Sequence, residues 1–187
     1  MSQRGGITLL EHTLLGLLYR KSSSGYDLRK IFATTALGSF SDSPGAIYPA
    51  LRRLQSKGLV KSQAATGGRR RRTVVLTEKG ANELKRWVTL PVTPEDAMKG
   101  LQEVMLRFAF SESVMGAHAS VEMLKGLEAQ LGAVVNNLRQ QMNGLKAVMP
   151  LSGVLALDSG IRGYEAQLHW AQDALSEFRR RKTPADG

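Results

Sequence analysis

The residues best suited to bind a charged ligand are arginines gathered at two places in the chain. Residues 69–72 are four consecutive arginines that follow a Gly-Gly pair. Arg52 and Arg53 lie in a second segment, residues 43–54. A guanidinium group is always charged, and its planar fork of N–H donors matches the oxygens of a phosphate. These two segments are therefore suited to bind a phosphate-rich polyanion.

The positive charge of the chain is concentrated in its first half. The formal net charge is +10 at pH 7. Residues 1–90 hold 16 Lys and Arg against 5 Asp and Glu, whereas residues 91–187 hold 10 against 11. This asymmetry is typical of a polyanion-binding domain joined to a domain without excess charge. The proline-marked segment 90–94 is the expected linker, so we expect two domains, residues 1–90 and 91–187.

The residue pattern gives no support for catalysis, metal binding or membrane spanning. The chain has no cysteine, which excludes disulfides and thiolate metal sites. Its histidines, His12, His118 and His169, are not at metal-ligand spacing, and no nucleophile elbow or phosphate-binding glycine loop occurs. The apolar stretch 14–19 is shorter than the roughly 18 residues of a membrane span. We therefore expect no enzyme, no cofactor and no metal, and a cytoplasmic protein in which His12 is structural.

Hydrophobic periodicity predicts three helices at the start of the chain. Leucines at helical spacing predict the first helix over residues 8–20, and Ser24 is a suitable N-cap for a second. Ser43 can cap a third helix with Pro44 as its first residue, because proline lacks the N–H that would be unpaired there. Gly58 follows this helix, where a left-handed residue commonly ends one.

A hairpin and a fourth helix complete the first half. Residues 59–64 and 70–76 are predicted strands that flank a glycine turn, and Thr77 caps a helix over residues 78–89. Helix, helix, helix, strand, strand, helix is the order of a winged helix-turn-helix domain. In such a domain the third helix enters the major groove of DNA and the hairpin is the wing.

The residue pattern of the predicted third helix indicates which of its faces is buried and which is exposed. Its apolar residues at i, i+3, i+4 and i+7 are Ile47, Ala50, Leu51 and Leu54. The candidate DNA-binding residues are Tyr26, Ser43, Ala46, Tyr48, Pro49, Arg52, Arg53, Arg69, Arg70 and Arg71. Helix residues would read base edges and wing arginines would bind phosphates. Two alternatives remain open: the helix cations form a solvated face, and Tyr48 packs under the wing.

The second half predicts helices with apolar seams. A short helix is expected from Thr93 to about Arg107, a long helix capped by Ser111 reaching about Met149, and a last helix over residues 153–181. The seams are Leu124, Leu127, Leu131, Val134, Leu138, Leu145 and Val148, then Leu157, Ile161, Tyr164, Leu168, Ala171, Leu175 and Phe178. Such helices need a packing partner, so we expect a helical dimerisation domain and a mainly α fold with one small β-hairpin.

Aromatic residues of the second half are candidates for an effector pocket. Small-molecule pockets are lined by apolar and aromatic side chains with a few polar groups. The candidates are Phe108, His118, Tyr164 and Trp170. The alternative is that each of them fills the core or a dimer interface.

Several segments of the first half resemble the PadR family of bacterial transcriptional regulators. They are Leu14-Leu15-Gly16-Leu17-Leu18, Gly25-Tyr26-Asp27-Leu28, residues 43–54, Lys57-Gly58-Leu59-Val60, residues 67–71 and Leu76-Thr77-Glu78-Lys79-Gly80. They fall between residues 9 and 90 in the family's order and spacing. The second half resembles the longer subgroup, which carries a C-terminal helical dimerisation domain. Arg72-Thr73-Val74 departs from the family, which often has an aromatic pair there.

The resemblance implies a homodimer that binds double-stranded DNA at a palindromic operator, usually as a repressor. It also implies release of DNA when a small molecule, often aromatic, is bound. Ser43, Ala46, Tyr48, Pro49 and Arg52 match the recognition helix of the family, and Arg69, Arg70 and Arg71 match its wing.

Two other functions fit a winged helix, because a fold alone does not define a function. One is an RNA-binding or protein-interaction adaptor. The other is a nucleoid-type protein with little sequence preference.

Overall fold

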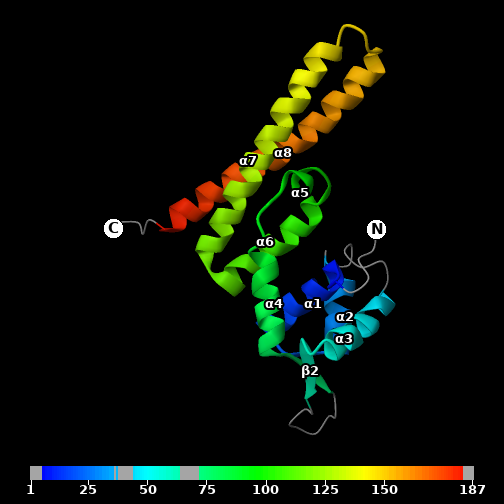
Figure 1. Cartoon of the computed structure of the whole chain (residues 1–187), viewed down its shortest axis with the longest axis vertical. Helices are drawn as coiled ribbons and strands as arrows, with labels where there is room; N and C mark the ends of the chain where they lie inside the picture. The colour runs from blue at the N-terminus through cyan, green and yellow to red at the C-terminus, as the bar shows by residue number, and fades with distance from the viewer. Residues whose placement is uncertain (1–5, 36, 38–43, 64–71, 183–187) are drawn as a thin grey trace. The chain divides into compact units, whose positions relative to one another are not determined.

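The computed structural model of the chain describes residues 6–35, 37, 44–63 and 72–182 (Figure 1). The chain divides into two compact units, Met1–Val88 and Thr89–Gly187. Helices dominate both units, and the first also contains a small antiparallel sheet. The predicted fold class, a winged helix-turn-helix domain followed by a helical domain, is confirmed.

The first unit has the element order that the sequence predicts. Its elements are α1 (Leu9–Arg20), β1 (Ser23–Ser24), α2 (Gly25–Thr34), the 3-10 helix η2 (Pro44–Ala46), α3 (Ile47–Ser56), β2 (Val60–Gln63), β3 (Thr73–Leu76) and α4 (Glu78–Val88). The strands pair in the order β1-β3-β2, with Val60 opposite Leu76 and Gln63 opposite Thr73. The two-residue strand β1 was not predicted, because a strand of that length has no recognisable period.

Local side-chain hydrogen bonds fix where these helices begin. Ser24 accepts a hydrogen bond from the Asp27 backbone N–H, and the Asp27 carboxylate accepts from the Ser24 N–H, so the predicted cap is confirmed. Thr8 and Glu11 form the same reciprocal box at the start of α1. Each box satisfies backbone donors that no intrahelical carbonyl can reach.

The start of α3 differs from the prediction. Residues 44–46 form a 3-10 turn, and the α-helix begins at Ile47 with no side-chain cap at Ala46. Ser43, the predicted cap, lies outside the described residues. The end of α3 agrees with the prediction, since Gly58 has a φ of 71°.

The predicted apolar face of α3 is confirmed as core. Ile47, Ala50, Leu51 and Leu54 are all buried, and so are Leu14 and Leu15 of α1. Gly80 of α4 allows a close approach to β2, because a Cβ there would lie 2.1 Å from the Leu59 carbonyl oxygen. Because the apolar face of α3 is buried, its polar residues remain on the exposed side of the helix.

The second unit consists of α5 (Pro94–Lys99), α6 (Leu101–Met115), α7 (Ala117–Leu145) and α8 (Leu151–Lys182). Two predicted boundaries were wrong. Gly100 interrupts the helix expected from Thr93 to Arg107. Ser111 does not cap a helix, because it is buried inside α6 and its Oγ donates to the Phe108 carbonyl at 2.8 Å. The long helix begins only after Gly116, whose φ of 84° most side chains avoid.

Helices α7 and α8 lie side by side as an antiparallel hairpin (Figure 1). The part of the seam near the other helices is buried, including Leu124, Leu127 and Leu131 of α7 with Ala171 and Leu175 of α8. The seam does not stay buried to the end of the hairpin, where Leu145 and Val148 are exposed.

Candidate nucleic-acid interface

The exposed face of α3 carries three residues one helical turn apart. Tyr48, Arg52 and Gln55 lie at i, i+4 and i+7, on a side of the helix next to its buried face. The Tyr48 side chain remains 46% exposed. It lies against the start of α2, since a Cβ at Gly25 would be 2.8 Å from Tyr48 Cε1. The tyrosine is therefore packed on one side and open to solvent on the other.

A hollow of about 470 Å³ separates this face of α3 from the sheet. Arg52 and Arg72 bring guanidinium groups to its lining, and Gln55 and Ser62 bring neutral polar groups. Sequence reasoning missed Gln55 and Ser62 as site residues. Gln55 could have been predicted from its helical spacing to Tyr48 and Arg52. No feature of the neighbouring sequence indicates that Ser62 lies at the site.

The other predicted contacts lie at different places in the first unit. Tyr26 is exposed in the first turn of α2, and Ala46 and Pro49 are partly exposed at the start of α3. Ser43, Arg69, Arg70 and Arg71 lie outside the described residues, so their role stays a prediction.

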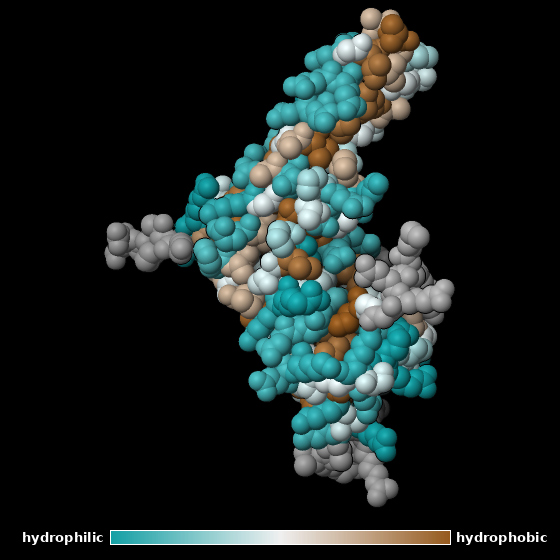
Figure 2. Space-filling view, viewed as in Figure 1, coloured by the Kyte–Doolittle hydropathy of each residue, from teal (hydrophilic) through white to brown (hydrophobic). Residues whose placement is uncertain are grey.

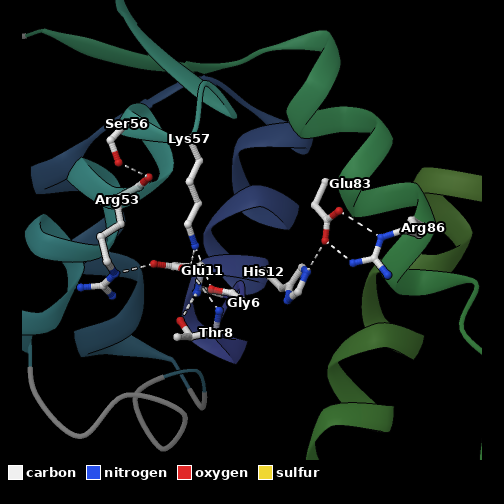
Figure 3. A network of polar contacts seen from close by, with 9 residues as sticks. All are labelled: Gly6, Thr8, Glu11, His12, Arg53, Ser56, Lys57, Glu83 and Arg86. Atoms are coloured by element: carbon white, nitrogen blue, oxygen red, sulfur yellow. Dashed lines mark hydrogen bonds and ion pairs between the residues drawn. The ribbon is translucent and has the colours of Figure 1, made fainter. Parts of the chain in front are cut away.

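Arg53, next to Arg52, has a partner inside the protein (Figure 3). Its Nε donates to Glu11 Oε1 at 2.6 Å, and Glu11 is fully buried. Lys57, directly after α3, brings its Nζ to 3.5 Å from the other carboxylate oxygen. Burial raises the pKa of the Glu11 carboxyl, but the Thr8 backbone N–H and the Arg53 guanidinium outweigh it and hold that pKa below its usual range. The two cations therefore tie α3 to α1.

A second polar group ties α1 to α4 (Figure 3). The His12 ring is 6% exposed and stacks on Trp87, with centroids 4.6 Å apart and planes 4° from parallel. His12 Nε2 lies 3.1 Å from Glu83 Oε1, and Glu83 also accepts from Arg86. The structural role predicted for His12 is confirmed. Together the two groups hold α3 and α4 on opposite sides of α1.

The structure brings together only two of the four predicted effector residues. Phe108 and Trp170 meet edge to face, with ring centroids 5.6 Å apart. Tyr164 instead donates its hydroxyl to the Met98 carbonyl at 3.4 Å, and His118 is exposed in the first turn of α7. Within the described part of the chain, no helix could cross a membrane and no group of three or more His, Cys, Asp or Glu could hold a metal ion.

Helices α2 and α3 with the hairpin of β2 and β3 define a winged helix-turn-helix domain. Residues 14–86 match the Transcriptional regulator PadR-like family. The long helices α7 and α8 fit the family's longer subgroup.

Two relatives are similar to part of this chain. The Transcriptional regulator YqjI of Escherichia coli is 37% identical over 76 residues, which are 41% of this chain and 36% of that protein. The Negative transcriptional regulator PadR of Bacillus subtilis is 30% identical over 119 residues, 60% of this chain and 62% of that protein. The chain thus covers about a third of the length of one relative and less than two thirds of the other.

Two solved structures are also similar to this chain. A PadR-like transcriptional regulator from Bacillus cereus has a TM-score of 0.45 and 24% identity, covering 95% of this chain and 99% of that one. Bacillus subtilis PadR in complex with operator DNA has a TM-score of 0.39 and 22% identity, covering 91% and 99%.

Proposed function

We propose that this protein is a sequence-specific DNA-binding regulator of transcription that acts in the cytoplasm. The observation that carries the proposal is the exposed face of α3, where Tyr48, Arg52 and Gln55 stand in one row. An arginine and an amide at this spacing can read base edges in the major groove. Arg72, the last of the four consecutive arginines, lies across the hollow. The relatives named as transcriptional regulators support this reading.

The wing supplies the second half of the proposed contact. Residues 69–72 would bring four guanidinium groups to the phosphates beside the groove occupied by α3. Tyr26 could add a hydroxyl donor at the start of α2, where it is exposed. We assign these contacts to affinity and the α3 contacts to sequence preference.

We further propose that the protein is a homodimer that binds a palindromic operator. The support is a set of exposed apolar residues around the connection between α7 and α8 (Figure 2): Leu145, Val148, Leu151 and Leu155. Val148 is 78% exposed and Leu151 73%. Clustered apolar residues of this kind mark interaction sites, because their burial removes apolar surface from water. A second copy would also supply the second recognition helix that a palindrome requires.

The direction of regulation is proposed from the Bacillus subtilis relative, which is named a negative regulator. We propose that this chain represses transcription and that a small molecule bound in the second unit releases it from DNA. The adjoining rings of Phe108 and Trp170 support the presence of such a ligand site.

The proposal is tested by selecting bound duplexes from random DNA with the full chain. Fluorescence anisotropy then compares the selected duplex with a scrambled one at several salt concentrations. We expect a selected sequence with dyad symmetry, bound at least about a thousandfold more tightly than the scrambled duplex. A ratio near one would instead indicate a nucleoid-type protein. Enrichment of RNA but not of DNA would indicate the adaptor function.

A further inference from the structure

We infer that a hollow between α6 and α8 binds an aromatic organic cation. The hollow measures about 430 Å³ and lies within the second unit. Three aromatic rings and three carboxylates dominate its lining: Phe108, Trp170, Phe178, Glu112, Asp173 and Glu177. Its volume is within the range of roughly 300–1,000 Å³ that small-molecule sites occupy.

The rings form the apolar part of this site. Phe108 stands edge to face with Trp170, and it meets Phe178 at 6.2 Å between centroids and 77° between planes. Trp170 is 37% exposed although it is the largest of the three. Tryptophan has the aromatic face that attracts cations most strongly. The trio thus offers a flat ligand several ring surfaces, including one that favours positive charge.

The charged residues of the lining favour a positively charged ligand. Among the residues that the structure describes, neither Glu112 nor Asp173 has an ion-pair partner. Glu177 is paired with Arg180, and Arg181 is the cation of the lining. Three carboxylates against one guanidinium disfavour an anion, even in a chain whose net charge is +10. A cation would meet both the indole face and two unpaired carboxylates.

This inference names the ligand class for the proposed effector, and it rests on the proposed function only where release of DNA is concerned. Binding of the cation is a separate event that can be measured without DNA. If the cation binds but the protein binds no DNA, the inference stands and the proposed function fails. If the protein binds DNA but not the cation, the inference alone is wrong.

The test uses three bicyclic aromatic probes of different charge. N-methylquinolinium is a cation, quinoline is neutral at pH 7.5, and 2-naphthoate is an anion. Isothermal titration of the full chain should give affinities in that order, with the cation at least about tenfold tighter than quinoline, since 1.4 kcal/mol corresponds to tenfold. Equal affinity for the cation and the anion would overturn the inference.

Two variants separate the contribution of the ring from that of the charges. Trp170→Ala should weaken binding of the cation at least about tenfold. Glu112→Gln combined with Asp173→Asn should bring the ratio between cation and quinoline close to one, while quinoline binds as before. Glu95→Gln, which removes an exposed carboxylate in the first turn of α5, is the matched control and should change neither affinity.

Thermal unfolding followed by circular dichroism checks that each variant is folded. If Trp170→Ala does not fold, Trp170→Phe replaces it. This variant should still weaken binding of the cation more than binding of quinoline, because a phenyl face attracts cations less strongly than an indole face. Unchanged cation affinity in a folded Trp170 variant would overturn the inference.

Discussion

The fully buried carboxylate of Glu11 accepts a 2.6 Å hydrogen bond from Arg53, the residue beside the exposed Arg52. Arg52 lines the hollow that faces the wing, whereas Arg53 turns toward α1. Two adjacent arginines of one helix thus have different surroundings. The structure connects Arg53 to stability, whereas Arg52 forms no ion pair with any residue that the structure describes.

Alanine substitution should separate these two arginines. Arg53→Ala leaves a buried carboxylate without its closest partner, so it should lower the free energy of unfolding by about 1–3 kcal/mol. Arg52→Ala should change it by less than about 0.5 kcal/mol but weaken binding to the selected duplex. Urea unfolding and anisotropy measure the two effects. Arg162→Ala, which removes the same charge from the second unit, should leave DNA binding unchanged.

Acid should destabilise the protein in part through Glu11. Its pKa is lower in the folded protein than in the unfolded chain, where it has its ordinary value of about 4.5. The stabilisation is therefore complete above that value and is lost as the pH falls through the folded pKa. Glu11→Gln should flatten the fall in unfolding free energy between pH 5 and pH 3. An equally steep fall in the variant would contradict the prediction.

The sequence predicted the elements of the first unit well because their signals are local. Ser24 with Asp27 and the spacing of Ile47, Ala50 and Leu54 each lie within two or three helical turns. The bond between Glu11 and Arg53 joins residues far apart in sequence, so no spacing rule could find it. For the same reason the sequence offered only a DNA contact or a solvated face for the Arg53 side chain, and not an internal ion pair.

The second unit was harder to predict because its boundary signals were ambiguous. Ser111 has the residue type of an N-cap, but inside a helix a serine can donate to a carbonyl three residues earlier, as it does here. Gly116 was one of several glycines in the region, and only the structure distinguishes it by its positive φ. The four effector candidates were chosen by residue type, which carries no information on which of them meet in space.

The wing should contribute affinity more than sequence preference. Replacing Arg69, Arg70 and Arg71 with alanine should weaken binding to the selected and scrambled duplexes by similar factors. The plot of the logarithm of the binding constant against the logarithm of the salt concentration has a negative slope. Its magnitude should decrease by up to about three units, because fewer counterions are released. Anisotropy titrations from low to moderate salt measure this. Parental affinity for both duplexes would show that the wing does not contact DNA.

The end of the α7–α8 hairpin should govern self-association. Leu151→Asp with Leu155→Asp would place charge on the exposed apolar surface and should lower the dimer affinity by at least about tenfold. Sedimentation at micromolar concentration measures the mass. Lys125→Asp, an exposed substitution elsewhere on α7, should leave the dimer intact. A monomeric parent would contradict the proposed dimer directly.

The contrast between Arg52 and Arg53 bears on how such a regulator could acquire new target genes. Neighbouring codons would be subject to different selection, one for a folded protein and the other for the promoter that is recognised. Changes at codons 52 and 55 could redirect the protein to another promoter without destabilising it. Changes at codon 53 would first reduce the amount of folded protein in the cell.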